Sequence, residues 1–231
     1  MIINFKMKSA DQNKPKKNRG MVDKEEITIH NEKDGTSSVT YKYRNDVFSI
    51  FEHDLFAELY NARCHDTGEP VSIESARQFK EILNKANATK IDHLDFHGMR
   101  LGINSIISLA NSLLYEKLVV LNVADNSLSD YGMHAIKNIL ETTHIEHLNL
   151  ASNMVSGDGL ETLTEAICNH KYLKSLDLGL QEGSMRKNSL GLHGASCIAA
   201  IVIKNQSINT LILNDNDIGK DGGDCIGIAL S

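Results

Sequence analysis

Three side chains near the middle of the chain are the first candidates for chemistry. His93, Asp95 and His97 alternate along a segment that we expect to be extended, so all three would lie on one face of a strand. Imidazole and carboxylate groups bind zinc, but a zinc site needs three or four ligands that converge. Two histidines four residues apart on a strand are separated by roughly twice the strand repeat, about 7 Å. We therefore predict no metal site here and expect these side chains to contact a partner.

Catalytic sequence motifs are absent from the chain. It contains no GxSxG, HExxH, phosphate-binding Gly-Lys-Ser/Thr or dinucleotide-binding motif. Its glycines instead recur with a repeat. We expect a protein without enzymatic activity and without a cofactor.

A repeated unit occupies the second half of the chain. Five segments start at Ile91, Leu118, Ile145, Leu173 and Ile208. Each has apolar residues at relative positions 1, 4, 6, 11, 19 and 23, when seven extra residues after Leu178 are left out of the count in the fourth segment. Positions 4 and 6 are one strand period apart, and positions 19 and 23 are about one helical turn apart. The spacing therefore predicts a unit of strand, loop and helix.

Two polar or small positions accompany the apolar ones. Asparagine stands at relative position 9 in four units, where its side chain can bond backbone groups of neighbouring turns. Glycine stands at position 15 in the same units, where a tight approach to the helix is expected. These residues are Asn126, Asn153, Asn188 and Asn216, and Gly132, Gly159, Gly194 and Gly222. Met99 takes the asparagine position in the first unit, so that end of the asparagine row must be closed differently.

The pattern over residues 91–231 resembles the ribonuclease-inhibitor-like class of leucine-rich repeats. That resemblance implies an α/β fold, a right-handed solenoid shaped as a horseshoe with a parallel sheet on the concave face and helices outside. Members of the class include ribonuclease inhibitor, Ran GTPase-activating proteins, sensor regions of NOD-like receptors and several centrosomal or axonemal proteins. They share protein binding and differ in partner, so the resemblance implies a class of function and no particular target.

Residues between the core positions of each strand would line the concave face. Because adjacent strands lie about 4.8 Å apart, these side chains should stack laterally. The predicted partner-binding residues are Asp92, His93, Asp95, His97, Asn122, Asp125, Glu146, His147, Asn149, Lys174, Asp177 and Asp215. Acids outnumber the lysine, which favours a basic or hydrogen-bonding partner. Asp and Asn are also common at these strand positions in the class whatever the ligand, so a structural role is an equal alternative.

The fourth unit contains seven extra residues, which fall between Leu178 and Asn188. Insertions in repeat proteins map to loops. We expect this loop to project at the edge of the concave face with Met185, Arg186 and Lys187, and Met185 and Arg186 complete the predicted partner-binding set. A tolerated surface insertion is the alternative.

Three segments precede the repeats. Residues 1–26 form a basic tail, expected to be disordered, that could bind an acidic partner in a salt-dependent way. Within residues 27–90 we predict a hairpin over 27–44 and two amphipathic helices that cap the array, the first including Phe48 and Phe51 and the second following Ser72. A short stretch from Leu59 to Pro70 also resembles the segment before the repeats in some centrosomal and ciliary proteins of this class.

Composition limits the setting of the protein. The formal net charge is -6, which argues against bulk attraction to nucleic acid or anionic lipid. No apolar run approaches the roughly 20 residues of a membrane helix, and four widely spaced cysteines fit reduced thiols. We expect an intracellular, cytoplasmic protein. The fifth unit reaches Ser231 inside its helix, and we expect an exposed flank that is continued in a longer array, or covered by a partner or a second copy.

These observations lead to one main hypothesis and two alternatives. The main hypothesis is an interaction scaffold or adaptor that binds a protein partner on its concave face, with a cytoskeletal or ciliary assembly as one setting. The first alternative is a GTPase-activating protein of the Ran type, although no segment matches the catalytic loop of that class. The second, an innate sensor or ribonuclease inhibitor, fits less well because such inhibitors have more repeats and abundant cysteine.

Overall fold

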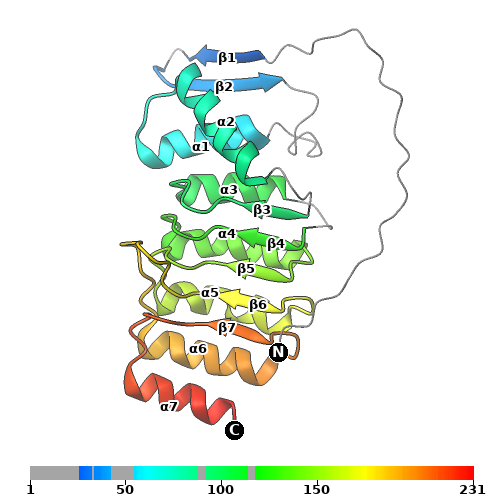
Figure 1. Cartoon of the computed structure of the whole chain (residues 1–231), viewed down its shortest axis with the longest axis vertical. Helices are drawn as coiled ribbons and strands as arrows, with labels where there is room; N and C mark the ends of the chain where they lie inside the picture. Colours follow the sequence, from blue (N-terminus) through cyan, green and yellow to red (C-terminus); the bar gives the residue numbers. More distant parts are fainter. Residues whose placement is uncertain (1–25, 33, 43–54, 88–91, 114–117) are drawn as a thin grey trace, which may run out of the picture.

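The computed structural model describes residues 26–32, 34–42, 55–87, 92–113 and 118–231. Figure 1 shows stacked strands on one side of the molecule and stacked helices on the other, with a hairpin and two helices at the amino-terminal end. Residues 1–25 of the basic tail and the helical positions predicted at Phe48 and Phe51 lie outside the described residues, whereas Glu26, the last residue assigned to the tail, begins the first strand. None of the described helices is long and apolar enough to cross a membrane.

Five short strands form one parallel sheet in sequence order, from β3 to β7. They are β3 (His93–Asp95), β4 (Val120–Asn122), β5 (His147–Asn149), β6 (Ser175–Asp177) and β7 (Thr210–Ile212). A helix follows each strand, in the order α3 (Ile103–Ser112), α4 (Ser129–Thr142), α5 (Gly157–Asn169), α6 (Gly191–Lys204) and α7 (Gly219–Ala229). This arrangement confirms the predicted solenoid of strand, loop and helix.

The leucine at relative position 4 aligns across the whole sheet. Leu94 pairs with Leu121, Leu121 with Leu148, Leu148 with Leu176, and Leu176 with Leu211. The first four leucines are at most 2 % exposed and belong to a single core. Adjacent strands are about 4.8 Å apart whereas packed helices need 8–10 Å, so the units fan outward and the sheet takes the concave side.

Buried asparagines tie each unit to the preceding one. The Nδ2 of Asn126 donates to the carbonyl of Phe96 in the first unit and to the carbonyl of Val123 in its own, both at 2.9 Å. Asn153 repeats the arrangement, donating to the carbonyls of Val123 and Leu150. These bonds satisfy backbone groups that the sharp turn after each strand would leave unpaired.

The amino-terminal elements cover the first unit. Strands β1 (Glu26–Asn31) and β2 (Ser37–Lys42) form an antiparallel hairpin, and α1 (Leu55–Thr67) and α2 (Ile73–Asn87) follow. The Asn61 side chain accepts from the backbone N–H of Val39 and donates to its carbonyl, which joins α1 to the hairpin. Phe56, Tyr60 and Phe79 pack ring against ring between the two helices, and α1 lies against α3.

Asp66, near the end of α1, caps the start of α3. Its carboxylate accepts from the backbone N–H groups of Gly102, Asn104 and Ser105 at 2.8–2.9 Å, and from the Ser105 hydroxyl at 2.6 Å. The first N–H groups of a helix have no partner within the helix, so a carboxylate there both satisfies them and opposes the positive end of the helix dipole. A Cβ at Gly102 would come within 2.7 Å of the Asp66 carboxyl carbon, so glycine permits this close approach.

Arg63 closes the end of the asparagine row where Met99 stands. Its Nε donates to the Met99 carbonyl at 2.9 Å, and its guanidinium lies over the Phe79 ring and pairs with Glu69. Glu69 also pairs with Arg100 of the first unit. Burial raises the pKa of the Glu69 carboxyl, but the hydrogen bond from Arg100 and the charges of both arginines outweigh it, so the pKa lies below its ordinary value.

The fifth unit has apolar side chains that are partly or largely exposed. Leu211 and Leu213 are only partly buried, although their counterparts in the third unit, Leu148 and Leu150, are almost fully buried. Ile228 of α7 is 77 % exposed.

Replacing Asp66 by alanine should lower the free energy of unfolding by about 1–2 kcal/mol, because the first turn of α3 then loses its acceptor. Urea denaturation followed by circular dichroism measures the change. Asp221→Ala, which removes an exposed acid from the first turn of α7, is the matched control and should cost less. An equal loss of unfolding free energy in the two variants would show that the Asp66 contacts stabilise the protein no more than an exposed acid does.

Candidate functional site

The polar stack predicted on the sheet face is present. The strand register places Asp95, Asn122, Asn149 and Asp177 side by side on four adjacent strands. Each also has a local structural role, because one side-chain oxygen accepts from the backbone N–H two residues further on, at 2.9–3.1 Å. These bonds hold the turn that leaves each strand. In the fifth unit Ile212 takes this position and the stack ends.

A second group of predicted residues lies at the beginning of the strands. His93 bonds Asp92 at 2.7 Å, and Lys174 pairs with Glu146 across adjacent strands at 2.6 Å. His147 is exposed beside them. These side chains are therefore largely paired with one another.

His93, Asp95 and His97 do not converge. The His93 imidazole is directed to Asp92, and an Asp95 carboxylate oxygen accepts from the backbone N–H of His97. Since no metal-ligating group of three forms from these residues in the described part of the chain, we interpret them as surface residues of the sheet face.

The insertion in the fourth unit folds back over the earlier units. We call residues 179–187 the repeat-four loop. Its Ser184 hydroxyl donates to a carboxylate oxygen of Asp125 at 2.5 Å, and the Arg186 guanidinium donates to the same oxygen at 3.2 Å. Near the beginning of the loop, the Gln181 backbone N–H donates to the Ser152 hydroxyl at 2.8 Å. The loop from unit four is thus fastened to unit three and to unit two.

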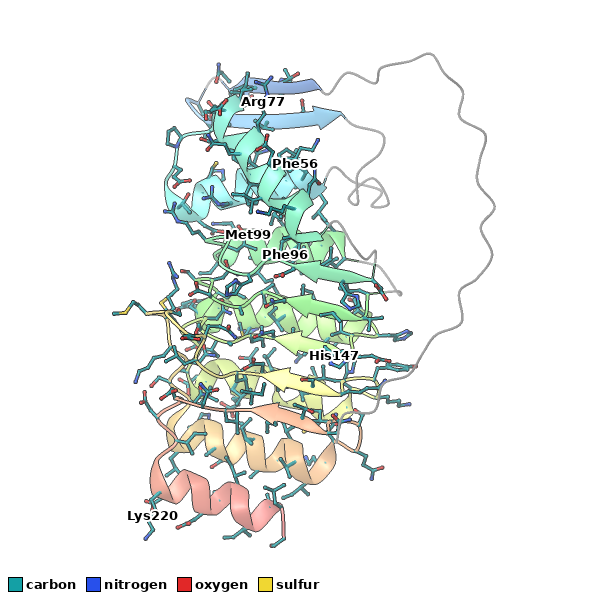
Figure 2. All side chains as sticks on the ribbon, in the orientation of Figure 1. Phe56, Arg77, Phe96, Met99, His147 and Lys220 are labelled. Atoms are coloured by element: carbon teal, nitrogen blue, oxygen red, sulfur yellow. The ribbon has the colours of Figure 1, made fainter. Side chains whose placement is uncertain are left out.

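The end of the repeat-four loop is fastened in the other direction. Lys187 pairs with Asp217 of the fifth unit at 2.8 Å, and the Ser189 hydroxyl donates to the same carboxylate. The hydrogen bond from Lys187 lowers the pKa of the Asp217 carboxyl below its ordinary value. Between these two attachments Met185 is 95 % exposed, and side chains of this loop project at the left edge of the molecule in Figure 2.

The structure therefore brings together three of the predicted site residues, Asp125, Met185 and Arg186, at the edge of the sheet face. Asp215 follows β7 with a positive φ and contacts Asn214, so it stands apart from this group. Sequence reasoning missed Ser184, and it did not predict that Ser184 and Arg186 both donate to Asp125. The repeat pattern holds no signal for it, because contacts between an insertion and another unit have no period.

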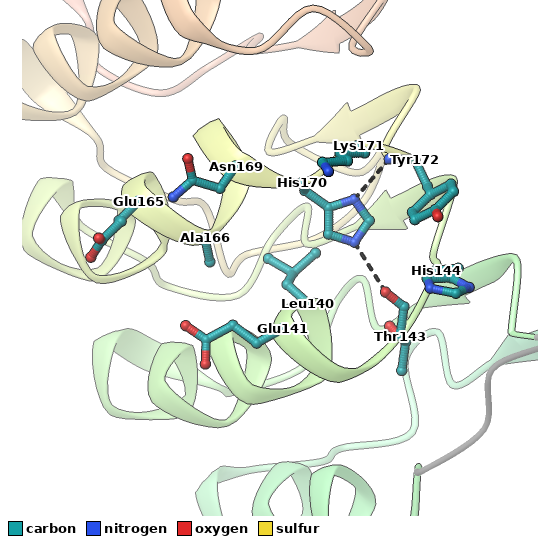
Figure 3. A pocket seen from close by; sticks show the side chains of 10 residues that line it. All are labelled: Leu140, Glu141, Thr143, His144, Glu165, Ala166, Asn169, His170, Lys171 and Tyr172. Atoms are coloured by element: carbon teal, nitrogen blue, oxygen red, sulfur yellow. Dashed lines mark hydrogen bonds between the residues drawn. The ribbon is translucent and has the colours of Figure 1, made fainter.

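A depression of about 400 Å³ lies at the opposite ends of the strands, between the last turns of α4 and α5. Figure 3 shows His170 at its base, with His144 and Tyr172 on one side and Glu141 and Glu165 on the other. His170 is almost fully buried.

His170 links two units through its neutral form. Its Nδ1 accepts from the backbone N–H groups of Tyr172 and Leu173, and its Nε2 lies 3.3 Å from the Thr143 carbonyl, so the proton belongs on Nε2. Burial, the largest cause, lowers the pKa of His170 below its ordinary value. Asn205 stands at the equivalent position of the fourth unit and makes the corresponding bonds with an amide.

Stacked units with a parallel sheet on one side and helices on the other define a solenoid protein. A family model for the leucine-rich repeat matches residues 142–163 and 204–227. These two matches and the stacked units show that the chain contains leucine-rich repeats, and its assignment to the ribonuclease-inhibitor-like subtype remains a prediction.

Known proteins with similar sequence or structure agree with this class. Over 231 residues the chain is 26 % identical to mouse NACHT, LRR and PYD domains-containing protein 14, an alignment that covers 88 % of this chain and 22 % of the relative. The chain thus spans about a fifth of that relative's length. Two solved structures share the fold, each at a TM-score of 0.50 and 16 % identity. The structure of leiomodin-1 actin-binding site 2 covers 69 % of this chain and 88 % of its own chain. The structure of the Caenorhabditis elegans tropomodulin C-terminal domain covers 67 % of this chain and 90 % of its own chain.

Asp125→Ala should release the repeat-four loop, because Ser184 and Arg186 lose their shared acceptor. Trypsin cleaves after Arg186 and Lys187 once the loop can enter a protease, so we expect cleavage there to accelerate several-fold, measured by mass spectrometry of timed digests. Asp215→Ala removes an exposed acid of the same edge outside these contacts and should leave the rate unchanged. A rate for Asp125→Ala equal to that of the original chain would mean that the contacts do not restrain the loop.

His170→Asn should reduce the sensitivity of the fold to acid. Below about pH 6.5 the His170 side chain takes up a proton in the unfolded state, whereas in the folded state its lowered pKa keeps it neutral. The free energy of unfolding therefore falls as the pH drops through that value. Asparagine has no such titration and, as Asn205 shows, can supply the same donor and acceptor. Urea unfolding at pH 7 and pH 5 measures the difference. His134→Asn, at an exposed position that does not line this depression, should keep the original pH dependence, and an equally large pH effect in both variants would contradict the role of His170.

Proposed function

We propose that this protein is a non-enzymatic scaffold or adaptor that binds a protein partner with its sheet face and its repeat-four loop. The observation that supports this most directly is the loop itself. It holds Met185 at 95 % exposure between attachments to Asp125 on one side and Asp217 on the other. An apolar side chain on a restrained loop loses little conformational freedom on binding, which makes it an effective interface anchor.

The sheet face complements the loop with polar groups. Asp95, Asn122, Asn149 and Asp177 form a continuous row, and one side-chain oxygen of each accepts its local turn bond. The amide groups of Asn122 and Asn149 and the second carboxylate oxygen of Asp177 are proposed to contact the partner. Carboxylates and amides in such a row favour a partner surface rich in basic groups or hydrogen-bond donors. We propose the other predicted residues of the face, His93, His97, His147 and the Glu146–Lys174 pair among them, as the rim of the same interface.

Actin is the first partner to test. The solved structure titled leiomodin-1 actin-binding site 2 shares the fold, although at 16 % identity it supports the architecture alone. We propose a cytoplasmic, cytoskeletal setting as the hypothesis to test first, and a ciliary setting is a more specific form of it. The comparisons give no support to a GTPase-activating protein of the Ran type, and we do not propose that activity.

Met185→Glu should weaken partner binding at least tenfold, because a charge replaces the apolar anchor. Co-sedimentation of the chain with filamentous actin tests the cytoskeletal proposal, and affinity purification from cell extract, compared between variants, tests the scaffold. Ile203→Glu is the matched control, since Ile203 is an exposed apolar residue on the helical side.

The two parts of the proposal fail separately. Absence of actin binding by the original chain would overturn the cytoskeletal setting alone. If Met185→Glu and Ile203→Glu retain the same proteins to the same extent, the repeat-four loop is not the binding element.

A further inference from the structure

Three metal-ligating side chains converge on the helical side of the molecule, away from the sheet face. Asp158 and Glu161 belong to α5, and His193 belongs to the neighbouring helix α6. One ligand atom from each lies within 4.8 Å of the others, and among the described residues this is the group of three that does so. All three side chains are exposed, so an ion could reach them from solvent.

The distances fit a bound ion. The Nε2 of His193 lies 3.2 Å from a carboxylate oxygen of Glu161 and 3.7 Å from one of Asp158. Zinc holds nitrogen and oxygen ligands at about 2.0–2.2 Å in a tetrahedron, which separates neighbouring ligand atoms by about 3.4 Å. Two of the three separations therefore lie near this value, and the third is no more than 4.8 Å.

The packing of α5 against α6 positions the three side chains. Asp158 and Glu161 are three residues apart on α5, so they lie on the same face of the helix about one turn apart. The backbone of Gly157 lies against the imidazole, since a Cβ there would come within 2.9 Å of both the Cβ and the Cδ2 of His193. Because Cδ2 is bonded to Nε2, this contact helps to fix the edge of the ring that faces the carboxylates.

The chemistry of the group selects the kind of ion. Two carboxylates balance the charge of a divalent cation, and an imidazole nitrogen favours zinc or another first-row transition metal over magnesium or calcium. The starts of α5 and α6 bring partial positive charge, which opposes a cation and limits the affinity. Water or a side chain of a partner would complete the tetrahedron.

We propose that Asp158, Glu161 and His193 form a divalent transition-metal site that cross-links the third and fourth units. It is distinct from His93, Asp95 and His97, and it does not rest on the proposed scaffold function. Without a metal the His193 imidazole lies within hydrogen-bond distance of the Glu161 carboxylate, so the experiment must separate metal binding from that contact.

Isothermal titration of the untagged chain with Zn²⁺, after removal of bound metals with EDTA, tests the site. We expect one ion per chain, with a dissociation constant below about 100 µM, and a rise in Tm of several degrees at saturating Zn²⁺ because the ion binds the folded state. Mg²⁺ at the same concentration should leave the Tm unchanged.

Three variants decide the assignment. His193→Ala and Glu161→Gln should each weaken Zn²⁺ binding at least tenfold, and Tm measured without metal shows whether each variant remains folded. His134→Ala removes another exposed histidine from the preceding helix α4 and should bind as the original chain does. Unchanged Zn²⁺ binding in both site variants, or an equal effect of Mg²⁺, would overturn the proposal, as would the absence of saturable binding.

Discussion

The alignment of one leucine per strand determines the arrangement of everything else. Each strand of the sheet spans only three residues and could not persist alone, and its central leucine is held by the leucines of its neighbours. Because side chains alternate along a strand, a slip of one residue would expose a leucine and bury an aspartate or asparagine. That penalty fixes the register, and the register fixes which polar side chains become neighbours on the sheet face.

The same constraint explains why the fourth unit can hold a long insertion. The extra residues leave after β6, and the chain returns at Asn188, which takes the asparagine position of its unit. Its Oδ1 accepts from the backbone N–H groups of Asn153 and Val155, and its Nδ2 donates to the Leu178 carbonyl. The stack is therefore restored immediately after the insertion, so the length and contacts of the loop can vary without cost to the core. Specific function is more easily placed on such a loop than on the strands.

Sequence reasoning predicted the features that depend on period and left out those that depend on contacts between units. The strands, the helices, the leucine register and the row of Asp95, Asn122, Asn149 and Asp177 all follow from spacing. Spacing could not show that Asp125 accepts hydrogen bonds from Ser184 and Arg186, which belong to a unit two repeats away. It could not show that Asp66 caps α3, because a carboxylate in one helix and N–H groups in another share no pattern. The alternation of His93, Asp95 and His97 is present, but the His93 imidazole bonds Asp92 and the Asp95 carboxylate accepts from the His97 backbone N–H, so the three side chains do not converge.

Variation at a fixed position of the repeat can create a site that no single unit contains. Relative position 14 is Tyr131 in the second unit, Asp158 in the third, His193 in the fourth and Asp221 in the fifth. Since the solenoid sets equivalent positions of adjacent helices side by side, an acid in one unit meets whatever stands in the next. Between the third and fourth units that pairing brings an imidazole to two carboxylates. The helical side, which in a scaffold would serve only to support the sheet, thereby acquires chemistry of its own from the same stacking that builds the sheet face.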